Sequence, residues 1–256
     1  MGKFSGILIC ADFDGTIALG GHVVEENIRA IRYFQENGGA FSVITGRTIN
    51  FLRSRENEII CNACVGCVNG TLIYDYPNQK QISASIITED LYEPLMKAHK
   101  YLNVPKHLDI FYLDDAEEIS DADEDFEQQV RTALSKTVLK VLIRSSKPYK
   151  DEEIEYIKNV VGSSFETCRS WERAFEIQNK GSNKGQAAKK IAELCNASKL
   201  ICVGDYENDL SMLEAADISY AVDNAIPLLK ERADRITVNV EKGAIAAIIK
   251  DLESEL

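Results

Sequence analysis

Leu8-Ile9-Cys10-Ala11-Asp12-Phe13-Asp14-Gly15-Thr16 is an apolar run that ends abruptly in two carboxylates, a glycine and a hydroxyl. Its apolar part, 7–11, predicts a buried strand. Side chains at the carboxyl end of a buried parallel strand face the crevice where open α/β sheets bind ligands, so we expect Asp12 and Asp14 to lie in a functional site. Two crowded carboxylates repel each other and usually share a cation or a proton. The alternative interpretation is an ordinary Asp-Gly turn after a strand.

Two further predicted strands also end in polar residues. The strand at 40–44 runs into Thr45-Gly46-Arg47, and helix-like residues resume through 51–52. Thr45 therefore stands near a helix N-terminus, where a hydroxyl and free backbone N–H groups can hold a phosphate, although it could also be an ordinary helix cap. The strand at 200–203 ends in Gly204-Asp205-Tyr206-Glu207-Asn208-Asp209, and Lys184 stands at the start of a helix predicted at 186–195.

The order of the predicted elements indicates two parts. Strands and helices alternate at both ends of the chain, which is typical of a parallel sheet. Short strands are also expected at 59–61, 63–68 and 72–74. The block from about 82 mixes strands and helices without an obvious catalytic group, and we take its acidic run, 114–125, as a solvated loop with a metal site as the weaker alternative. We expect an α/β fold: a doubly wound, Rossmann-like parallel-sheet core (1–81 and 180–256) with an inserted α+β cap (82–179).

The composition is that of an ordinary globular protein with an acidic surface. The chain of 256 residues has 29 basic and 41 acidic residues, a net charge of −12. This charge argues against nucleic acid or an anionic membrane as a partner, and no protein partner is evident. No apolar run is long enough to span a membrane or to form a secretory signal, so we expect a cytoplasmic protein.

Seven cysteines, an odd number, fit a reducing compartment better than a disulfide framework. The spacing of Cys61, Cys64 and Cys67 is similar to part of an iron–sulfur ligand run. The usual fourth cysteine followed by proline is missing, and the segment continues as a strand-like sequence. Small apolar core residues are the favoured interpretation, and a metal cluster is the alternative.

Taken together, the polar strand ends point to one chemistry. In a doubly wound sheet these ends can converge on a single crevice, which would collect four carboxylates, a hydroxyl and an ammonium. Hard oxygen ligands in that number suit Mg²⁺, which keeps several waters and bridges to phosphate. The expected reaction is metal-assisted phosphoryl transfer with a carboxylate nucleophile.

Four ordered motifs carry a resemblance to the haloacid dehalogenase (HAD) superfamily of phosphatases. They are Asp12-Phe13-Asp14-Gly15-Thr16, Ile44-Thr45-Gly46-Arg47, Lys184-Gly185 and Gly204-Asp205-Tyr206-Glu207-Asn208-Asp209. The inserted block between the second and third motifs resembles the Cof-type sugar-phosphatase branch, which has a large α+β (type IIB) cap that confers substrate specificity. Tyr206 departs from the commonest pattern, which has a small residue there.

The resemblance implies roles for the motif residues. Asp12 would attack phosphorus and become an aspartyl-phosphate, and Asp14 would protonate the leaving alcohol and then activate water. Thr45 and Lys184 would also be catalytic: Thr45 would bind a phosphoryl oxygen, and Lys184 would neutralise charge on the phosphoryl group and on Asp12.

The resemblance also implies the ligands of the metal and of the phosphate. Mg²⁺ would bind the Asp12 carboxylate, the Asp14 backbone carbonyl and Asp205, with Asp209 as a further or outer-shell ligand. The phosphate would contact Thr45, Gly46, Arg47 and Lys184, and Asn208 would contact the phosphate or position Lys184.

The leading hypothesis is a Mg²⁺-dependent phosphatase that acts on a small phosphorylated metabolite, and a sugar phosphate is the expected substrate class. The same core could serve a phosphomutase or phosphotransferase, in which a second alcohol replaces water as the acceptor. A binding or regulatory protein without turnover is the third hypothesis, and the competent residue at every motif position argues against it.

Overall fold

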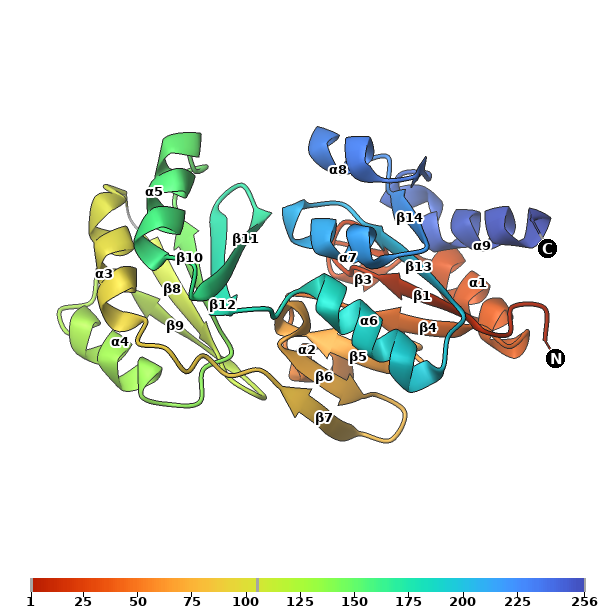
Figure 1. Ribbon diagram of the computed structural model, residues 1–256, viewed down its shortest axis with the longest axis horizontal. Coiled ribbons are helices and arrows are strands. Elements are labelled where there is room, and N and C mark those ends of the chain that lie inside the picture. Colours follow the sequence, from red (N-terminus) through yellow and green to blue (C-terminus); the bar gives the residue numbers. More distant parts are fainter. Residues whose placement is uncertain (1, 105, 256) are drawn as a thin grey trace. The chain divides into compact units, whose positions relative to one another are not determined.

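A computed structural model describes residues 2–104 and 106–255, which form two compact units (Figure 1). The core unit comprises the chain up to Ser83 and from Asn183 onward, and the cap unit comprises Ala84–Ser182. The catalytic role of the first unit and the specificity role of the second stay predictions.

The core unit is built on a parallel sheet of five strands. The order across the sheet is β15 (Arg235–Ile236), β14 (Ile218–Ala221), β13 (Lys199–Gly204), β1 (Ile7–Ala11) and β4 (Ala40–Val43). All five residues of β1 are buried, as expected for a central strand that pairs in parallel with β13 and β4. From β1 the chain first adds β4 on one side and later adds β13 on the other. The switch point, where such sheets bind ligands, therefore lies between β1 and β13.

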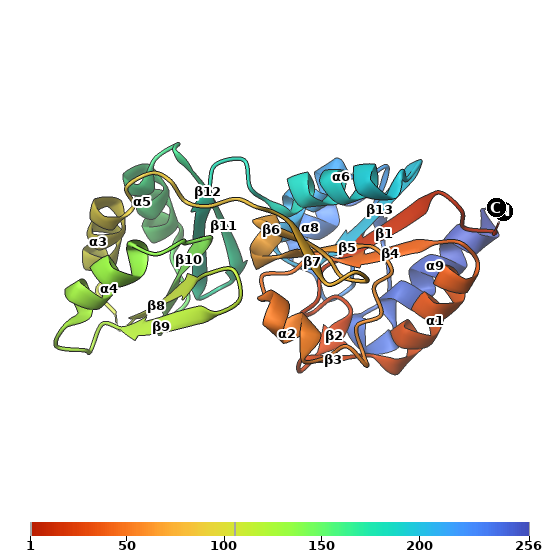
Figure 2. The ribbon, with the colours of Figure 1, turned by 90° about the horizontal axis from the view of Figure 1, so that it is seen from below.

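Helices cover both faces of this sheet, which confirms the doubly wound α/β core. Figure 2 shows α6 on one side of the sheet and α1 and α9 on the other. The Asn183 side chain starts α6 by accepting a hydrogen bond from the Gln186 backbone N–H at 2.9 Å. The helices of the core unit are α1 (Glu25–Glu36), α2 (Ile49–Arg53), α6 (Lys184–Cys195), α7 (Leu210–Ala215), α8 (Pro227–Arg232) and α9 (Ala244–Ser254).

Short strands complete the core unit, and one predicted strand is wrong. A hairpin, β2 (Ala18–Leu19) and β3 (His22–Val23), follows the first motif, and β5 (Cys64–Cys67), β6 (Leu72–Asp75) and β7 (Lys80–Ala84) form a separate antiparallel sheet. The segment 59–61 is not a strand. Its buried residues Ile59 and Cys61 imitate strand periodicity, but the Ile60 carbonyl accepts its hydrogen bond from the Gln35 side chain.

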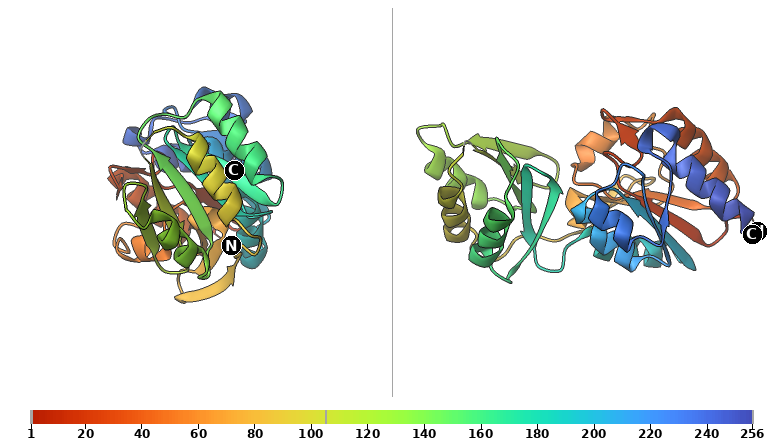
Figure 3. Two further views of the ribbon diagram at one scale, coloured as in Figure 1. Left: turned by 90° about the vertical axis from the view of Figure 1, so that its left-hand side faces the viewer. Right: turned by 90° about the horizontal axis from the view of Figure 1, so that it is seen from above.

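The cap unit is an antiparallel sheet with its helices on one face, consistent with the predicted α+β insertion (Figure 3). The order is β11 (Phe165–Trp171), β12 (Ala174–Asn179), β10 (Lys140–Ser145), β8 (Lys106–Phe111) and β9 (Ala116–Ser120). The helices are α3 (Tyr92–Tyr101), α4 (Phe126–Leu134) and α5 (Asp151–Val161).

The acidic run at 114–125 is not wholly a loop, because β9 lies within it. Ile119 is fully buried in the cap core, and the strand pairs with β8. Acidic residues are rare in strands, and a single inward apolar residue gives no visible alternation, so sequence periodicity misses this edge strand. Within the two described ranges, no helix has both the length and the apolar character needed to cross a membrane.

Candidate active site

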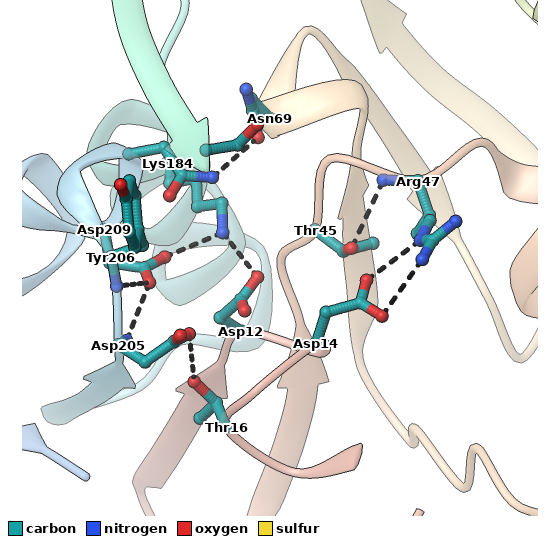
Figure 4. A network of polar contacts seen from close by, with 12 residues as sticks. Asp12, Asp14, Thr16, Thr45, Arg47, Asn69, Lys184, Asp205, Tyr206 and Asp209 are labelled. Atoms are coloured by element: carbon teal, nitrogen blue, oxygen red, sulfur yellow. Dashed lines mark hydrogen bonds and ion pairs between the residues drawn. The ribbon is translucent and has the colours of Figure 1, made fainter. Parts of the chain in front are cut away.

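Three carboxylates meet at the switch point of the core sheet (Figure 4). Asp12 directly follows β1, Asp205 directly follows the neighbouring β13, and Asp209 closes the 3₁₀ turn Glu207–Asp209. One oxygen from each of these carboxylates lies within 4.8 Å of the others. The convergence follows from parallel pairing, because Ala11 lies beside Val203 and both chains leave the sheet at the same edge.

Lys184 lies in the middle of these charges. It is the first residue of α6, and its side chain is almost fully buried. Its Nζ lies 2.5 Å from Asp12 Oδ1 and 2.7 Å from Asp209 Oδ1. Burial lowers the pKa of this amine, but the charges of Asp12 and Asp209 outweigh burial and raise the pKa, so Lys184 stays an ammonium.

Asp209 shapes the loop that carries Asp205. Its Oδ1 faces Lys184, while its Oδ2 accepts hydrogen bonds from the backbone N–H groups of Asp205 (2.9 Å) and Tyr206 (3.1 Å). Gly204 allows this fold-back, because a β-carbon there would stand 2.4 Å from the Asp209 β-carbon. Protein donors therefore engage both oxygens of Asp209, which suits an outer position at a metal site.

Asp205 is held against the first motif. Thr16 Oγ1 donates to Asp205 Oδ1 at 3.0 Å. Burial and the neighbouring Asp209 raise the pKa of Asp205 to about 7. Burial also raises the pKa of Asp12, and Asp209 and Asp205 raise it further against the opposing effect of Lys184. If all three carboxylates were ionised, their negative charge would exceed what the one lysine neutralises.

Asp14 does not join this group with its side chain. Figure 4 shows its carboxylate turned toward Arg47 and away from Asp12. Arg47 Nε lies 2.9 Å from Asp14 Oδ2, and Nη2 lies 3.1 Å from Oδ1. The hydrogen bond to Asp14 raises the pKa of Arg47 despite partial burial. Four residues were expected around the metal, and the structure brings together the side chains of three of them, Asp12, Asp205 and Asp209. The fourth, Asp14, was expected to contribute its backbone carbonyl, so the direction of its side chain does not contradict that expectation.

Thr45 lies at the same edge of the sheet, but it does not cap a helix. It is buried, and its Oγ1 accepts a hydrogen bond from the Arg47 backbone N–H at 3.2 Å. The cap of α2 is Thr48, whose hydroxyl accepts from the Phe51 backbone N–H. This rules out the helix-cap alternative for Thr45.

Asparagines support the site from the side. Asn208 donates to Asn69 Oδ1 at 3.3 Å, and the Asn69 backbone N–H donates to the Thr45 carbonyl at 2.8 Å. Asn69 is buried with a left-handed backbone, φ 58°. These bonds connect the loop 205–209 (the Asp205 loop) with the loop 45–48 (the Thr45 loop).

Sequence reasoning gave no role to two residues that hold the first motif. Thr16 fixes Asp205, as described above. Asn224 Nδ2 donates to the Gly15 carbonyl at 2.7 Å, and its Oδ1 accepts from the Val240 backbone N–H at 2.8 Å. The signal in the sequence that could have found them is position: Thr16 ends the first motif, and Asn224 lies shortly after the carboxyl end of β14, the strand beside β13.

The alternative metal sites gain no support. Cys64 and Cys67 lie three residues apart on one strand, so their side chains point to opposite faces. Over the described part of the chain, Asp12, Asp205 and Asp209 form the one group of three potential ligands found close together, which leaves out the cysteines and the acidic run.

Comparisons with known proteins agree with this arrangement. Residues 9–249 match the family described as haloacid dehalogenase-like hydrolases. Phosphatase YwpJ of Bacillus subtilis is 27% identical, over 96% of this chain and 99% of the relative. The phosphatase YitU of the same organism, named for 5-amino-6-(5-phospho-D-ribitylamino)uracil, is 24% identical over 95% of this chain and 96% of its own.

Solved structures show the same fold. The HAD subclass IIB sugar phosphatase BT4131 superposes with a TM-score of 0.80 at 19% identity, covering 95% of this chain and 98% of the other. A haloacid dehalogenase-like hydrolase from B. subtilis superposes with a TM-score of 0.77 at 23% identity, over 95% and 98% of the two chains. The fold is therefore that of subclass IIB. Because the family match covers residues 9–249, the chain belongs to the family of haloacid dehalogenase-like hydrolases.

Proposed function

We propose that this hydrolase is a Mg²⁺-dependent phosphatase that acts on a small phosphorylated metabolite, such as a sugar phosphate, through an aspartyl-phosphate on Asp12. The observation that carries the proposal is the buried Asp12 carboxylate, which is paired with Lys184 and lies among the carboxylates of Asp205 and Asp209. The curated relatives that bear the word phosphatase in their names support the reaction class.

The residues present fit a magnesium ion. Three carboxylates offer oxygen ligands within 4.8 Å of one another, and burial and mutual repulsion raise the pKa values of Asp12 and Asp205. A hard dication relieves that repulsion and prefers such ligands. We propose that Asp12, Asp205 and the Asp14 carbonyl hold the ion, with Asp209 in an outer position. When bound, Mg²⁺ would neutralise charge on the phosphoryl oxygens.

The chain's own residues would carry out the two steps. An Asp12 oxygen forms a bond to phosphorus while the bond from phosphorus to the leaving oxygen breaks, and Asp14 gives that oxygen its proton. Water then attacks the same phosphorus, the bond to Asp12 breaks, and Asp14 takes the proton from the water. Lys184 would balance the negative charge on Asp12 and the phosphoryl group throughout.

Phosphate binding is assigned to the Thr45 loop and its neighbours. We propose that the Thr45 hydroxyl, the backbone of the loop at Gly46 and Arg47, and the side chains of Lys184 and Asn208 contact the phosphoryl group. Phosphoryl transfer depends mostly on such positioning and charge neutralisation. The cap unit is proposed to select the leaving group.

The test is phosphate release from para-nitrophenyl phosphate with and without Mg²⁺. We expect Mg²⁺-dependent turnover that disappears in Asp12→Asn. Asp14→Asn is the matched variant: its nucleophile is intact, so we expect it to accumulate a phosphorylated protein detectable by mass spectrometry, whereas Asp12→Asn does not. Turnover that survives Asp12→Asn contradicts the mechanism. A folded, Mg²⁺-binding parent protein without turnover on this ester or on a sugar-phosphate panel contradicts the proposed function.

A further inference from the structure

The side chain of Arg47 is directed to Asp14. Its guanidinium makes two near-parallel hydrogen bonds to the carboxylate, with Nε at 2.9 Å and Nη2 at 3.1 Å from the two oxygens. Such a two-point contact fixes the rotation of a carboxylate as well as its position. A phosphate ligand would need these same donors, so the pair raises the question of what Arg47 does for the reaction.

The pair contributes little to folding. About half of each side chain is exposed, 49% for Arg47 and 46% for Asp14. Ion pairs between solvent-exposed groups add little stability because water and salt screen them. A two-point geometry at an exposed position therefore suggests control of orientation, and substitution of Arg47 should leave the fold intact.

Arg47 is itself held in place by packing that returns to the first motif. Its guanidinium lies over the Phe51 ring, 4.7 Å from the centroid, and Phe51 meets the buried ring of Phe13 edge-on at 5.4 Å. Phe13 is the residue between Asp12 and Asp14. Phe51 therefore packs between Phe13 of the first motif and the Arg47 guanidinium that binds Asp14 of the same motif.

The backbone of Arg47 is fixed as well. Its N–H donates to Thr45 Oγ1 at 3.2 Å, and its carbonyl accepts from the Val68 N–H at 2.9 Å. With both its backbone and its side chain held, Arg47 presents the guanidinium to Asp14 at little cost in conformational entropy.

We propose that Arg47 is a positioning residue that orients Asp14 for proton transfer, and that its side chain is not primarily a phosphate ligand. This inference rests on the proposed function. An ionised carboxylate has about four acceptor positions, and the two bonds to Arg47 use only two of them. Each Asp14 oxygen keeps a position that can hold the proton that the protonated Asp14 gives to the leaving oxygen, and that the ionised Asp14 later takes back from water.

Positioning and phosphate binding predict different dependence on the leaving group. Para-nitrophenolate leaves without help, whereas the more basic phenolate of phenyl phosphate needs a proton. The two esters share the phenyl ring and the phosphoryl group and differ by the para nitro group. The ratio kcat/KM covers binding and the first step only, whereas kcat also includes hydrolysis of the aspartyl-phosphate, in which Asp14 takes the proton from water whichever ester was the substrate. Loss of Asp14 orientation should therefore lower kcat/KM only for phenyl phosphate, whereas loss of a phosphate ligand should lower kcat/KM for both esters alike.

The experiment compares Arg47→Lys and Arg47→Gln with the parent enzyme on both esters. We expect kcat/KM on phenyl phosphate to fall about tenfold or more, and kcat/KM on the nitrophenyl ester to change less than about threefold. Arg55→Lys is the matched control, because Arg55 also lies over Phe51, at 5.0 Å, but pairs with Glu58. We expect this control variant to leave kcat/KM on both esters unchanged.

Three outcomes overturn the inference. An equal loss of kcat/KM on both esters would make Arg47 a phosphate ligand. An unchanged or higher kcat/KM on phenyl phosphate would show that the pair does not assist Asp14. Absence of turnover in the parent protein would contradict the proposed function and the inference with it. The first two outcomes differ from this one because in them the parent protein is active and only the Arg47 variants decide the result.

Discussion

Gly15 lies directly against the carboxylate of Asp205: a β-carbon at position 15 would stand 2.6 Å from Asp205 Oδ2. The backbone of Gly15 is also left-handed, with φ +79°. The first motif thus needs glycine for two reasons, one of conformation and one of space, and the second reason concerns a proposed metal ligand.

We predict that Gly15→Ala lowers both Mg²⁺ affinity and phosphatase activity. The added methyl group must displace the end of the Asp205 side chain, which moves a ligand without disrupting the core. Gly20→Ala is the control, since Gly20 has φ +57° and a β-carbon added there would meet nothing within 4 Å. Both variants should lose about 1 kcal/mol of unfolding free energy from backbone strain. Equal Mg²⁺ affinity in the two variants, measured by calorimetry, would contradict the prediction.

A second prediction concerns pH and Asp205. Burial and Asp209 raise its pKa to about 7, so between its ordinary value and about 7 the folded protein binds a proton that the unfolded chain has released. In the absence of metal, the free energy of unfolding from this group therefore falls as pH rises through that window. Mg²⁺ bound at the proposed site would hold Asp205 in its ionised form and would reverse the effect.

Thermal unfolding checks this prediction. We expect Mg²⁺ to raise Tm more at pH 8 than at pH 6. At pH 8 most Asp205 side chains are already ionised, whereas at pH 6 Mg²⁺ binding must first remove a proton from Asp205, which costs part of the binding free energy. In Asp205→Asn the difference between the two pH values should shrink. If the variant keeps the full difference, another group is responsible.

A third prediction concerns the cap unit. Lys140 on β10 and Glu176 on β12 form a buried ion pair at 3.0 Å, and Ser170 Oγ donates to the same carboxylate at 2.8 Å. Lys140→Met leaves Glu176 buried without that charge partner, and we expect a loss of about 3 kcal/mol. Lys140→Met combined with Glu176→Gln removes both charges, so it should recover most of the loss.

Urea unfolding followed by tryptophan fluorescence measures this effect in the full chain. The single tryptophan, Trp171, lies on β11 of the cap unit and reports on that unit. Losses that simply add in the double variant would show that the two residues do not interact energetically.

Local sequence was sufficient for the elements that carry the site. The apolar run of β1 is buried on both faces, so hydrophobicity alone marks it as a central strand, and the polar residues after it mark the strand end. The same logic identifies β13 and β4. Because parallel strands expose their carboxyl ends at one edge, the meeting of Asp12, Asp205, Asp209 and Lys184 was predictable from the sequence.

Local sequence failed where partners are distant. The segment 59–61 has the apolar pattern of a strand, but its carbonyl is satisfied by Gln35 rather than by a neighbouring strand. The strand β9 was hidden among acidic residues, and a single buried Ile119 was too weak a periodic signal. Hydrogen bonds between distant residues leave no periodic trace.

The sequence by itself determined the α/β core, the order of its motifs and the set of residues that could bind metal and phosphate. Only the tertiary structure decided how that set divides: Lys184 joins Asp12 and Asp209, whereas Asp14 turns to Arg47. The reason is physical. Strand and helix periodicity follow from neighbouring residues, but the direction of a carboxylate depends on which donors the folded chain brings within hydrogen-bonding distance.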